Sequence, residues 1–267
     1  MRIATAAVLG AAILGAGSLL AMPALALDLA GLNNRNELLL FTDKAPGKVK
    51  TIAITGVEGK LLGIDVRPAD RKLYALASNS TIYTIDTMTG AATRKAKLSV
   101  VLDSIDHVIV DFNPQADRMH VIGSSGQSLR VNVDTGQAIV DGKLAYRPAD
   151  RNAGKPMGVY AGAYINSFAG ATQTQLFDVD SLNGTYIVQD PPNDGVLRTV
   201  GPTGLKPGTI VESIDIYTDA KDGYHGFAVS GGMLYRFDVG TGKMGKGSAI
   251  GNGKTAVIDI AVLTPRQ

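Results

Sequence analysis

Four aspartates stand in similar apolar segments, which read LLGIDVRP, HVIVDFNP, VESIDIYT and TAVIDIAVL. They are Asp65, Asp111, Asp215 and Asp259. Carboxylate oxygens suit Ca²⁺ or Mg²⁺, and two acids flanking a bond can cleave a glycoside. The third possibility is structural: each carboxylate accepts backbone amides of a neighbouring element or pairs with an arginine. Regular recurrence favours this structural role, because catalytic roles diverge between repeats whereas structural roles recur.

The segments that carry these acids are short, β-branched and apolar, which predicts buried strands. A fifth and weaker segment, GVYAGAYINS, puts Tyr164 in the place of the acid. Centred on the four acids and Tyr164, the spacings along the chain are 46, 53, 51 and 44 residues. The chain is therefore built from repeats of about 45 residues, a period typical of β-propeller blades.

A second set of segments lies between these strands, and in each an Asp or Asn precedes a Gly by four residues. The pairs are Asp43 and Gly47, Asp86 and Gly90, Asn132 and Gly136, Asp180 and Gly184, and Asp238 and Gly242. The Asx side chain can bond backbone amides where a turn starts, and glycine can take the positive φ that closes it. Each pair predicts a hairpin turn at the same place in each repeat.

Together these patterns predict an all-β fold, a five-bladed β-propeller. The chain starts inside a blade and ends on an inner strand near Asp259, so the C-terminal strand is expected to complete the first blade and close the ring. The fourth repeat is irregular, because only 20 residues separate Tyr164 from Gly184 where the second and third repeats have 25. We expect its second strand to be short or missing, and VQDPPNDG to add a loop.

The pentapeptide RPADR occurs twice, at residues 67–71 and 147–151. The first copy follows an inner strand, and its counterpart in the next repeat is NPQADR at residues 113–118. The second copy falls out of register, near the end of a repeat. It is interpreted as a coincidence of turn residues, with a two-site ligand motif as the alternative.

Three stretches resemble the bacterial family called domain of unknown function 4394: LLGIDVRPADRKLYAL, VDFNPQADRMHVIGSSGQSLRVNVDTG and YINSFAGATQTQLFDVDSLNGTYIVQDPPNDGVLRTVGPTG. NSFAGAT and QDPPNDG are the most specific parts. The resemblance covers about residues 32–263. It implies a β-propeller-like, exported protein, and it implies no activity and no catalytic residues.

The two irregular loops of the fourth repeat are the expected binding loops, because binding residues gather on loops held by a rigid scaffold. The alternative is packing that replaces a lost strand. The residues expected to bind are Asn166, Phe168, Asp190, Asn193 and Asp194.

The first residues, MRIATAAVLGAAILGAGSLLAMPALA, have the layout of a secretory signal that ends in an A-x-A site. Residues 1–26 are expected to be removed and residues 27–267 to form one domain in the periplasm or outside the cell. Removal takes away Arg2, so Lys plus Arg falls from 26 to 25 against 24 acids. This near-neutral chain is expected to bind no nucleic acid, to keep no stable membrane anchor and to be a monomer.

Catalytic motifs are not evident in the sequence. It has no cysteine and no G-x-S-x-G, and its three histidines lack metal-ligand spacing. The leading hypothesis is an exported, non-catalytic module that binds or scaffolds an unknown protein or small molecule, without a cofactor. The alternatives are a glycoside-type hydrolase or a Ca²⁺-binding propeller, each using the four acids, and a structural component of the cell envelope.

Overall fold

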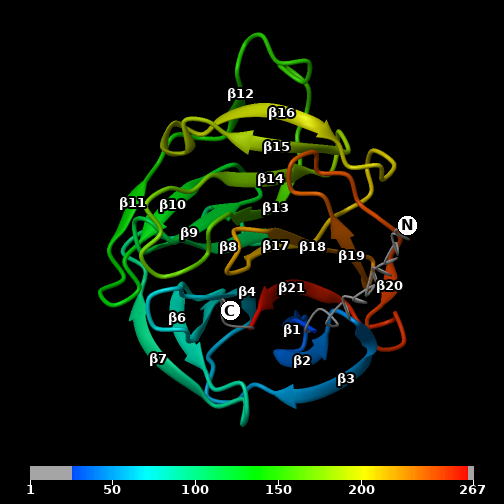
Figure 1. Ribbon diagram of the computed structural model, residues 1–267. Helices are drawn as coiled ribbons and strands as arrows, with labels where there is room; N and C mark the ends of the chain where they lie inside the picture. The colour runs from blue at the N-terminus through cyan, green and yellow to red at the C-terminus, as the bar shows by residue number, and fades with distance from the viewer. Residues whose placement is uncertain (1–25, 264–267) are drawn as a thin grey trace, which may run out of the picture.

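Five sheets, antiparallel except for the outermost strand pair of one sheet, surround a central axis in the computed structural model, which describes residues 26–263 (Figure 1). The innermost strands are β21 (Val257–Val262), β4 (Leu61–Val66), β8 (Val108–Asn113), β13 (Val159–Tyr164) and β17 (Ser213–Thr218). They coincide with the five segments that the sequence pattern predicts as inner strands. The prediction of a five-bladed β-propeller is therefore confirmed.

The remaining strands follow outward from each inner strand. Blade one adds β1 (Asp28–Asn33), β2 (Glu37–Thr42) and β3 (Ala45–Ala53). Blade two adds β5 (Leu73–Ala77), β6 (Thr81–Ile85) and β7 (Ala92–Lys97). Blade three adds β9 (Arg118–Gly123), β10 (Ser128–Val131) and β11 (Ala138–Val140). Blade four adds β14 (Leu176–Asp180), β15 (Thr185–Gln189), β16 (Val196–Pro202) and, outermost and parallel to β16, β12 (Ala145–Tyr146). Blade five adds β18 (Tyr224–Ser230), β19 (Met233–Phe237) and β20 (Ser248–Ala249).

The ring is closed inside blade one, where β21 pairs antiparallel with β1. The register places Asp259 opposite Leu32 and Ala261 opposite Ala30, so strands from the two ends of the domain form one sheet. The predicted closure by the C-terminal strand is confirmed. Closure leaves no inner strand with an unpaired edge toward its own blade, which is how propellers protect their sheets.

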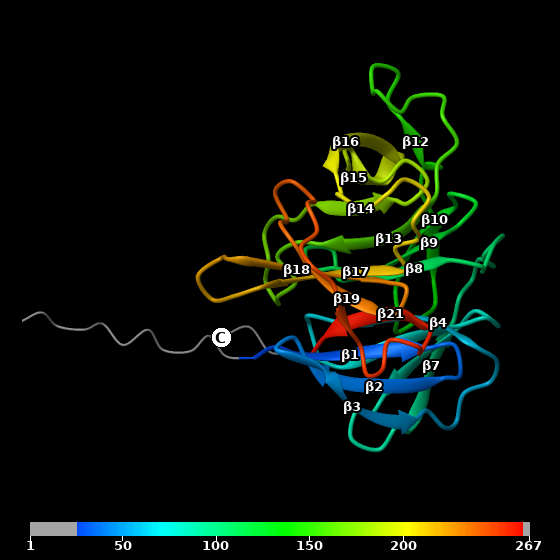
Figure 2. The same ribbon diagram turned by 90° about the vertical axis from the view of Figure 1, so that its right-hand side faces the viewer.

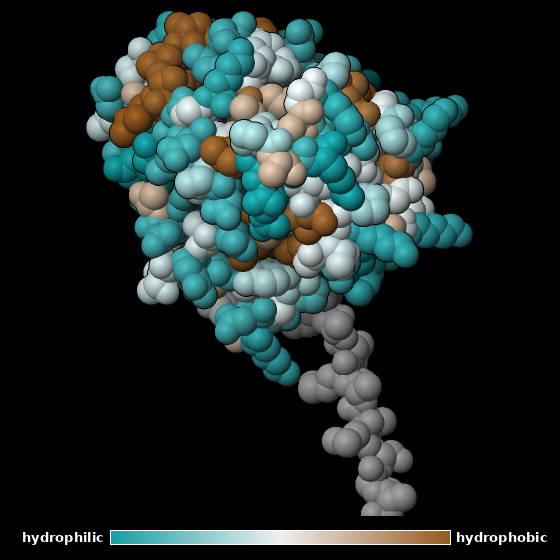
Figure 3. Space-filling view, turned by 90° about the horizontal axis from the view of Figure 1, so that it is seen from above, coloured by the Kyte–Doolittle hydropathy of each residue, from teal (hydrophilic) through white to brown (hydrophobic). Residues whose placement is uncertain are grey.

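The hydrophobic core lies in the five seams between neighbouring blades rather than along the axis. One cluster joins blades two and three through Tyr74, Phe112 and Val121, and another joins blades five and one through Phe227 and Ile260. Apolar side chains of the inner strands, such as Phe112 and Ile260, therefore pack between neighbouring blades. Seen from the side of β12 and β16, the surface is mostly hydrophilic with separate hydrophobic patches (Figure 3).

The Asx–Gly turns have the predicted role in three blades. Gly90, Gly136 and Gly242 lie between the third and fourth strands with φ between 76° and 77°. Gly47 is an exception, because it lies within β3 and is not among the glycines with positive φ. The prediction that Gly47 closes a turn through positive φ was wrong, since the chain already reverses between Thr42 and Ala45.

Blade four differs from the sequence-based prediction. Its second strand, β14, is present with five residues, so the expectation of a short or missing strand was wrong. The turn from Asp180 to Gly184 joins the second and third strands here, whereas the equivalent turns elsewhere join the third and fourth. The distance from the inner strand to the Asx–Gly turn is shorter in this repeat because the turn comes one hairpin earlier.

The first RPADR copy fastens blade two to blade three. Its turn joins β4 to β5, and the Arg67 guanidinium donates to both carboxylate oxygens of Asp117 in the NPQADR turn, at 2.8 and 2.6 Å. The second copy lies in the loop between β12 and β13, which projects beyond blade four (Figure 2). There Asp150 accepts the amide of Thr199 at 2.7 Å. The two copies have different structural settings, as the out-of-register interpretation predicts.

Candidate functional site

The four aspartates singled out in the sequence all lie on inner strands and are buried, with 3–8% of their surface exposed. Each carboxylate accepts a backbone amide from the next blade around the ring. The donor–acceptor pairs are Ile64 to Asp259 at 2.7 Å, Phe112 to Asp65 at 2.7 Å, Tyr164 to Asp111 at 3.1 Å, and Val262 to Asp215 at 2.6 Å. The predicted structural role is confirmed, since these bonds fasten blade to blade.

Three of these acids also approach one another. Asp65, Asp111 and Asp215 each offer an oxygen that lies within 4.8 Å of the others. Burial, reinforced by the neighbouring carboxylates, raises the pKa of Asp65 and Asp111 well above the usual range. Burial also raises the pKa of Asp215, to about 6. Such a group must share protons or hold a cation, and its oxygens are ligands that suit Ca²⁺.

Asp259 is not among the three acids whose oxygens lie within 4.8 Å of one another. Its Oδ1 accepts the Ser213 hydroxyl at 2.5 Å and the Ile260 amide at 2.9 Å. Burial raises the pKa of its carboxyl to about 8. The neighbouring space, lined by Val110, Gly162 and Ser213 among others, has no room for even a water molecule and cannot take a sugar ring. Asp259 therefore does not face an open space of the kind that glycoside cleavage requires.

Tyr164 does not join the ring of acids. Its hydroxyl contacts His120 Nδ1 at 2.6 Å in the seam between blades three and four, and His120 Nε2 contacts the Ser128 hydroxyl at 2.7 Å. Burial lowers the pKa of His120 to about 3, so one ring nitrogen donates and the other accepts. This serine–histidine pair is buried on neighbouring strands of blade three, and its contact with Tyr164 was missed in the sequence because Tyr164 belongs to the next repeat.

The first irregular loop of blade four, residues 165–175, is anchored by Asn166. The Asn166 amide donates to Thr218 Oγ1 at 3.1 Å, and its Oδ1 accepts the Tyr224 hydroxyl at 3.1 Å. Asn166 is 8% exposed and has a φ of 59°. Its side chain joins blades four and five, and Phe168 nearby is partly buried. This arrangement has the geometry of the packing alternative.

The second irregular loop lies between β15 and β16 and contains a short 3₁₀ helix, Pro192–Asp194. Asp190, Asn193 and Asp194 are exposed. The Asn193 carbonyl accepts the Gly142 amide at 2.9 Å, which holds the loop against the segment before β12. Both irregular loops lie at the same end of blade four, so the structure brings the predicted binding loops to one side without joining their side chains in a pocket.

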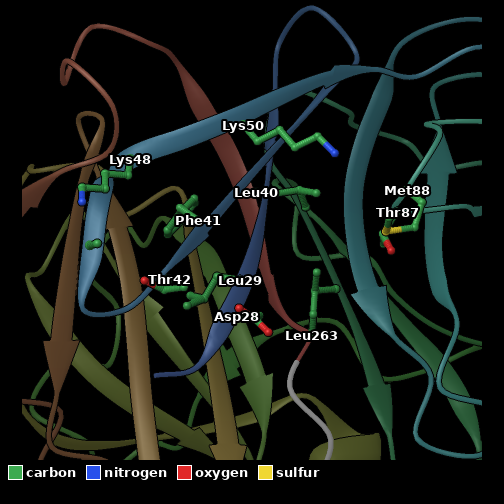
Figure 4. Close-up of a pocket in the computed structure, with 11 residues that line it drawn as sticks. Asp28, Leu29, Leu40, Phe41, Thr42, Lys48, Lys50, Thr87, Met88 and Leu263 are labelled. Carbon is green, nitrogen blue, oxygen red and sulfur yellow. The ribbon is translucent and has the colours of Figure 1, made fainter. Parts of the chain in front are cut away.

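A groove of about 480 Å³ lies at the end of blade one, beside the turn between β6 and β7 (Figure 4). Its floor is formed by Leu29, Leu40 and Phe41, and its far side by Thr87 and Met88. The remaining lining residues are Asp28, Thr42, Ala45, Lys48, Lys50 and Leu263. The groove combines strands β1, β2 and β3 with a turn of the next blade, so its shape depends on the packing of two blades.

The chemistry of the groove is apolar with a cationic edge. Leu29 and Phe41 are 0% and 5% exposed, whereas Met88 is 74% exposed. Lys48 and Lys50 project from β3, and Lys50 extends toward the turn that carries Met88 (Figure 4). The sequence analysis missed this site, although an exposed methionine in an Asx turn was a possible signal. Methionine side chains adapt to varied apolar ligands.

Residues 26–263 contain no helix of the length and hydropathy that a membrane crossing requires. The predicted signal, residues 1–26, lies outside the described residues except for Ala26.

The chain was compared with known protein families, curated proteins and solved structures. A family model described as a domain of unknown function (DUF4394) matches residues 37–261. Among curated proteins no sequence matches the chain. A protein of unknown function from Bacteroides thetaiotaomicron shares 17% identity at a TM-score of 0.49. A virginiamycin B lyase from Staphylococcus aureus shares 12% at 0.44. Each comparison covers 82% of this chain, which spans 57% and 64% of those two chains.

Proposed function

We propose, for a chain that belongs to the DUF4394 family, that it is an exported, non-catalytic binding module whose ligand lies in the groove on blade one. The observation that carries this proposal is the groove itself. Its volume of about 480 Å³ falls within the roughly 300–1,000 Å³ that small-molecule sites occupy. Its walls are mostly strands of a closed ring, which favours a preformed site.

The lining supports a ligand with an apolar body and an anionic end. Leu40 and Phe41 offer an apolar floor, and the ammonium groups of Lys48 and Lys50 offer partners for a carboxylate. Asp28 lies at the other side of the groove and repels an anion there. The anionic end is therefore expected beside the lysines, away from Asp28, and the apolar chain across the floor formed by Leu29, Leu40 and Phe41.

Dodecanoate is a suitable probe for this proposal. We expect dodecanoate to bind the mature protein and the double variant Lys48→Glu/Lys50→Glu to bind it at least about tenfold more weakly, which corresponds to about 1.4 kcal/mol. Isothermal titration calorimetry measures both affinities. Lys72→Glu is the matched control, because Lys72 is exposed on the turn between β4 and β5, outside the groove.

Two results would contradict the proposal. One is equal affinity of dodecanoate for the wild type and the double variant. The other is tighter binding of the cationic dodecyltrimethylammonium ion than of dodecanoate, because the lysines favour the anion.

A second candidate function is cation binding by the inner-strand aspartates, and the cluster of Asp65, Asp111 and Asp215 oxygens favours it. A site that holds its ion at 100 times the dissociation constant adds about 2.7 kcal/mol to stability. The expected rise in melting temperature is therefore about 5–10 °C when millimolar Ca²⁺ replaces EDTA. Asp111→Asn should abolish the rise. An unchanged melting temperature would leave shared protons as the explanation of the cluster.

A further inference from the structure

Leu27, the residue before β1, is held at both its backbone and its side chain. The Leu27 amide donates to Asp43 Oδ1 at 2.8 Å, and the Asp43 amide donates to the Leu27 carbonyl at 3.0 Å. The Leu27 side chain is 7% exposed and packs in the cluster that joins blades five and one. Ala26, immediately before it, is exposed. The chain thus passes from an exposed to a fixed residue at the Ala26–Leu27 bond.

The environment of Asp43 keeps its carboxyl group ionised, so it can pair with a positive charge. Its side chain is fully buried, and its Oδ2 accepts the Arg236 guanidinium from β19, with Lys44 Nζ at 3.6 Å. Burial opposes ionisation, but the hydrogen bond from Leu27 and the Arg236 charge outweigh it and hold the pKa of the Asp43 carboxyl below its usual value. The Asp43 carboxylate is therefore an anion, and its other oxygen, Oδ1, already accepts a hydrogen bond from the Leu27 nitrogen.

We infer that the Ala26–Leu27 bond is a proteolytic processing site and that Asp43 binds the α-amino group which cleavage creates on Leu27. Hydrolysis by a signal peptidase consumes one water: the hydroxyl goes to the Ala26 carbonyl carbon and a proton to the Leu27 nitrogen. A further proton from solvent makes that nitrogen an ammonium at the position where the amide now lies. A hydrogen bond from a neutral amide to the carboxylate becomes an ion pair in which both the donor and the acceptor are charged.

The consequence is a tighter closure of the ring in the processed chain. Leu27 leads directly into β1, which pairs with β21, and Asp43 is bound to Arg236 of blade five. The ammonium of Leu27 therefore strengthens the contact between the closing blade and its neighbour. This inference is independent of the groove and of its ligand.

The stability that the new α-amino group of Leu27 adds to the processed chain should depend on pH. An unfolded α-amino group titrates near pH 8, and the Asp43 carboxylate raises that pKa in the folded chain. The added stability is then complete below about pH 8 and is lost as pH rises through the folded pKa. The other charged groups near this site are Lys44, Arg236 and the exposed Asp28.

The experiment compares the chain that begins at Leu27 with the chain that retains Ala26, each released from a cleavable fusion. We expect the Leu27 chain to melt about 2–4 °C higher at pH 6.5, and this difference to disappear near pH 10 and in the Asp43→Asn pair. N-terminal acetylation of the Leu27 chain should also remove the difference. Acetylation provides the test if Asp43→Asn fails to fold.

The N-terminus of the exported protein provides an independent measurement. Mass spectrometry of the protein secreted from the full-length chain should give Leu27 as the first residue. A different first residue, or equal melting temperatures of the free and acetylated Leu27 chains, overturns the inference.

Discussion

At the residue scale, the four buried aspartates of the inner strands hold neighbouring blades together, but their burial disfavours their charged form. Each fastens one blade to the next through a backbone amide, as in Asp65 with Phe112, yet the same burial opposes their charge. Asp259 shows this most clearly, because it accepts three hydrogen bonds and its carboxyl still has a pKa raised by burial to about 8. The acids therefore contribute most to stability in their protonated form.

This opposition between burial and charge predicts a pH dependence. A carboxyl whose pKa is raised in the folded state binds a proton that the unfolded chain has released, so its contribution to stability declines as pH rises to the folded pKa. We expect the free energy of unfolding to fall between about pH 5 and 8, by up to about 1.4 kcal/mol per pH unit from Asp259, because its folded pKa is about 8. Asp259→Asn should reduce this slope, measured by urea denaturation at each pH.

Asp86→Asn is the control for that measurement. Asp86 is exposed in the turn between β6 and β7, and its pKa is lowered by hydrogen bonds from Thr89 and Met88. Its titration lies far below pH 7, so the slope should stay as in the wild type. Identical slopes for the wild type and Asp259→Asn would show that Asp259 is ionised throughout this range.

At the scale of the elements, the turns show how local chemistry and blade packing combine. Gly90, Gly136 and Gly242 each take a positive φ, and each backbone also lies against the neighbouring blade. In blade four the same Asx–Gly signal closes a different hairpin, between β14 and β15. The Asx–Gly pattern therefore specifies a turn, but it does not specify which two strands of the blade that turn joins.

Substitutions at Gly136 and Gly154 distinguish the cost of a positive φ from the cost of steric crowding by the neighbouring blade. A Cβ on Gly136, with φ 77°, would lie 1.9 Å from the Lys97 carbonyl oxygen, whereas a Cβ on Gly154, with φ 74°, would meet nothing within 4 Å. We expect Gly154→Ala to cost about 1–2 kcal/mol for the backbone alone. Gly136→Ala should cost about 2–5 kcal/mol, because steric crowding is added. Urea denaturation midpoints measure both, and equal costs would contradict the crowding argument.

At the scale of the whole molecule, the ring depends on a strand from the end of the domain. β21 supplies the inner strand of blade one and packs between β4 and β17, so it contacts three blades. Without it, β1 would have a free edge and the clusters at both seams of blade one would be open. Stability should therefore be cooperative across the ring.

A truncation tests this cooperativity. The chain ending at Thr255 should lose its cooperative thermal transition and bind an apolar dye, because removing β21 exposes two seams. The chain ending at Leu263 is the control and should melt like the wild type. A cooperative transition at an unchanged temperature in the shorter chain would show that the blades are stable without closure.

The local features of the sequence determined much of the architecture. Short β-branched segments around Asp65, Asp111, Asp215 and Asp259 specify strands because the backbone preference and the burial of alternate side chains are properties of a few adjacent residues. The order of strands and turns specified the closure by the C-terminal strand. Even the structural role of the acids followed from their regular recurrence.

Only the tertiary structure decided which side chains meet. Ile64 and Asp259 are bonded across 195 positions of the chain, and the groove brings Leu29, Met88 and Leu263 together from three parts of the sequence. His120, Ser128 and Tyr164 likewise meet at a seam. Such contacts depend on how blades pack, and packing is set by the summed shape of many side chains rather than by any local pattern.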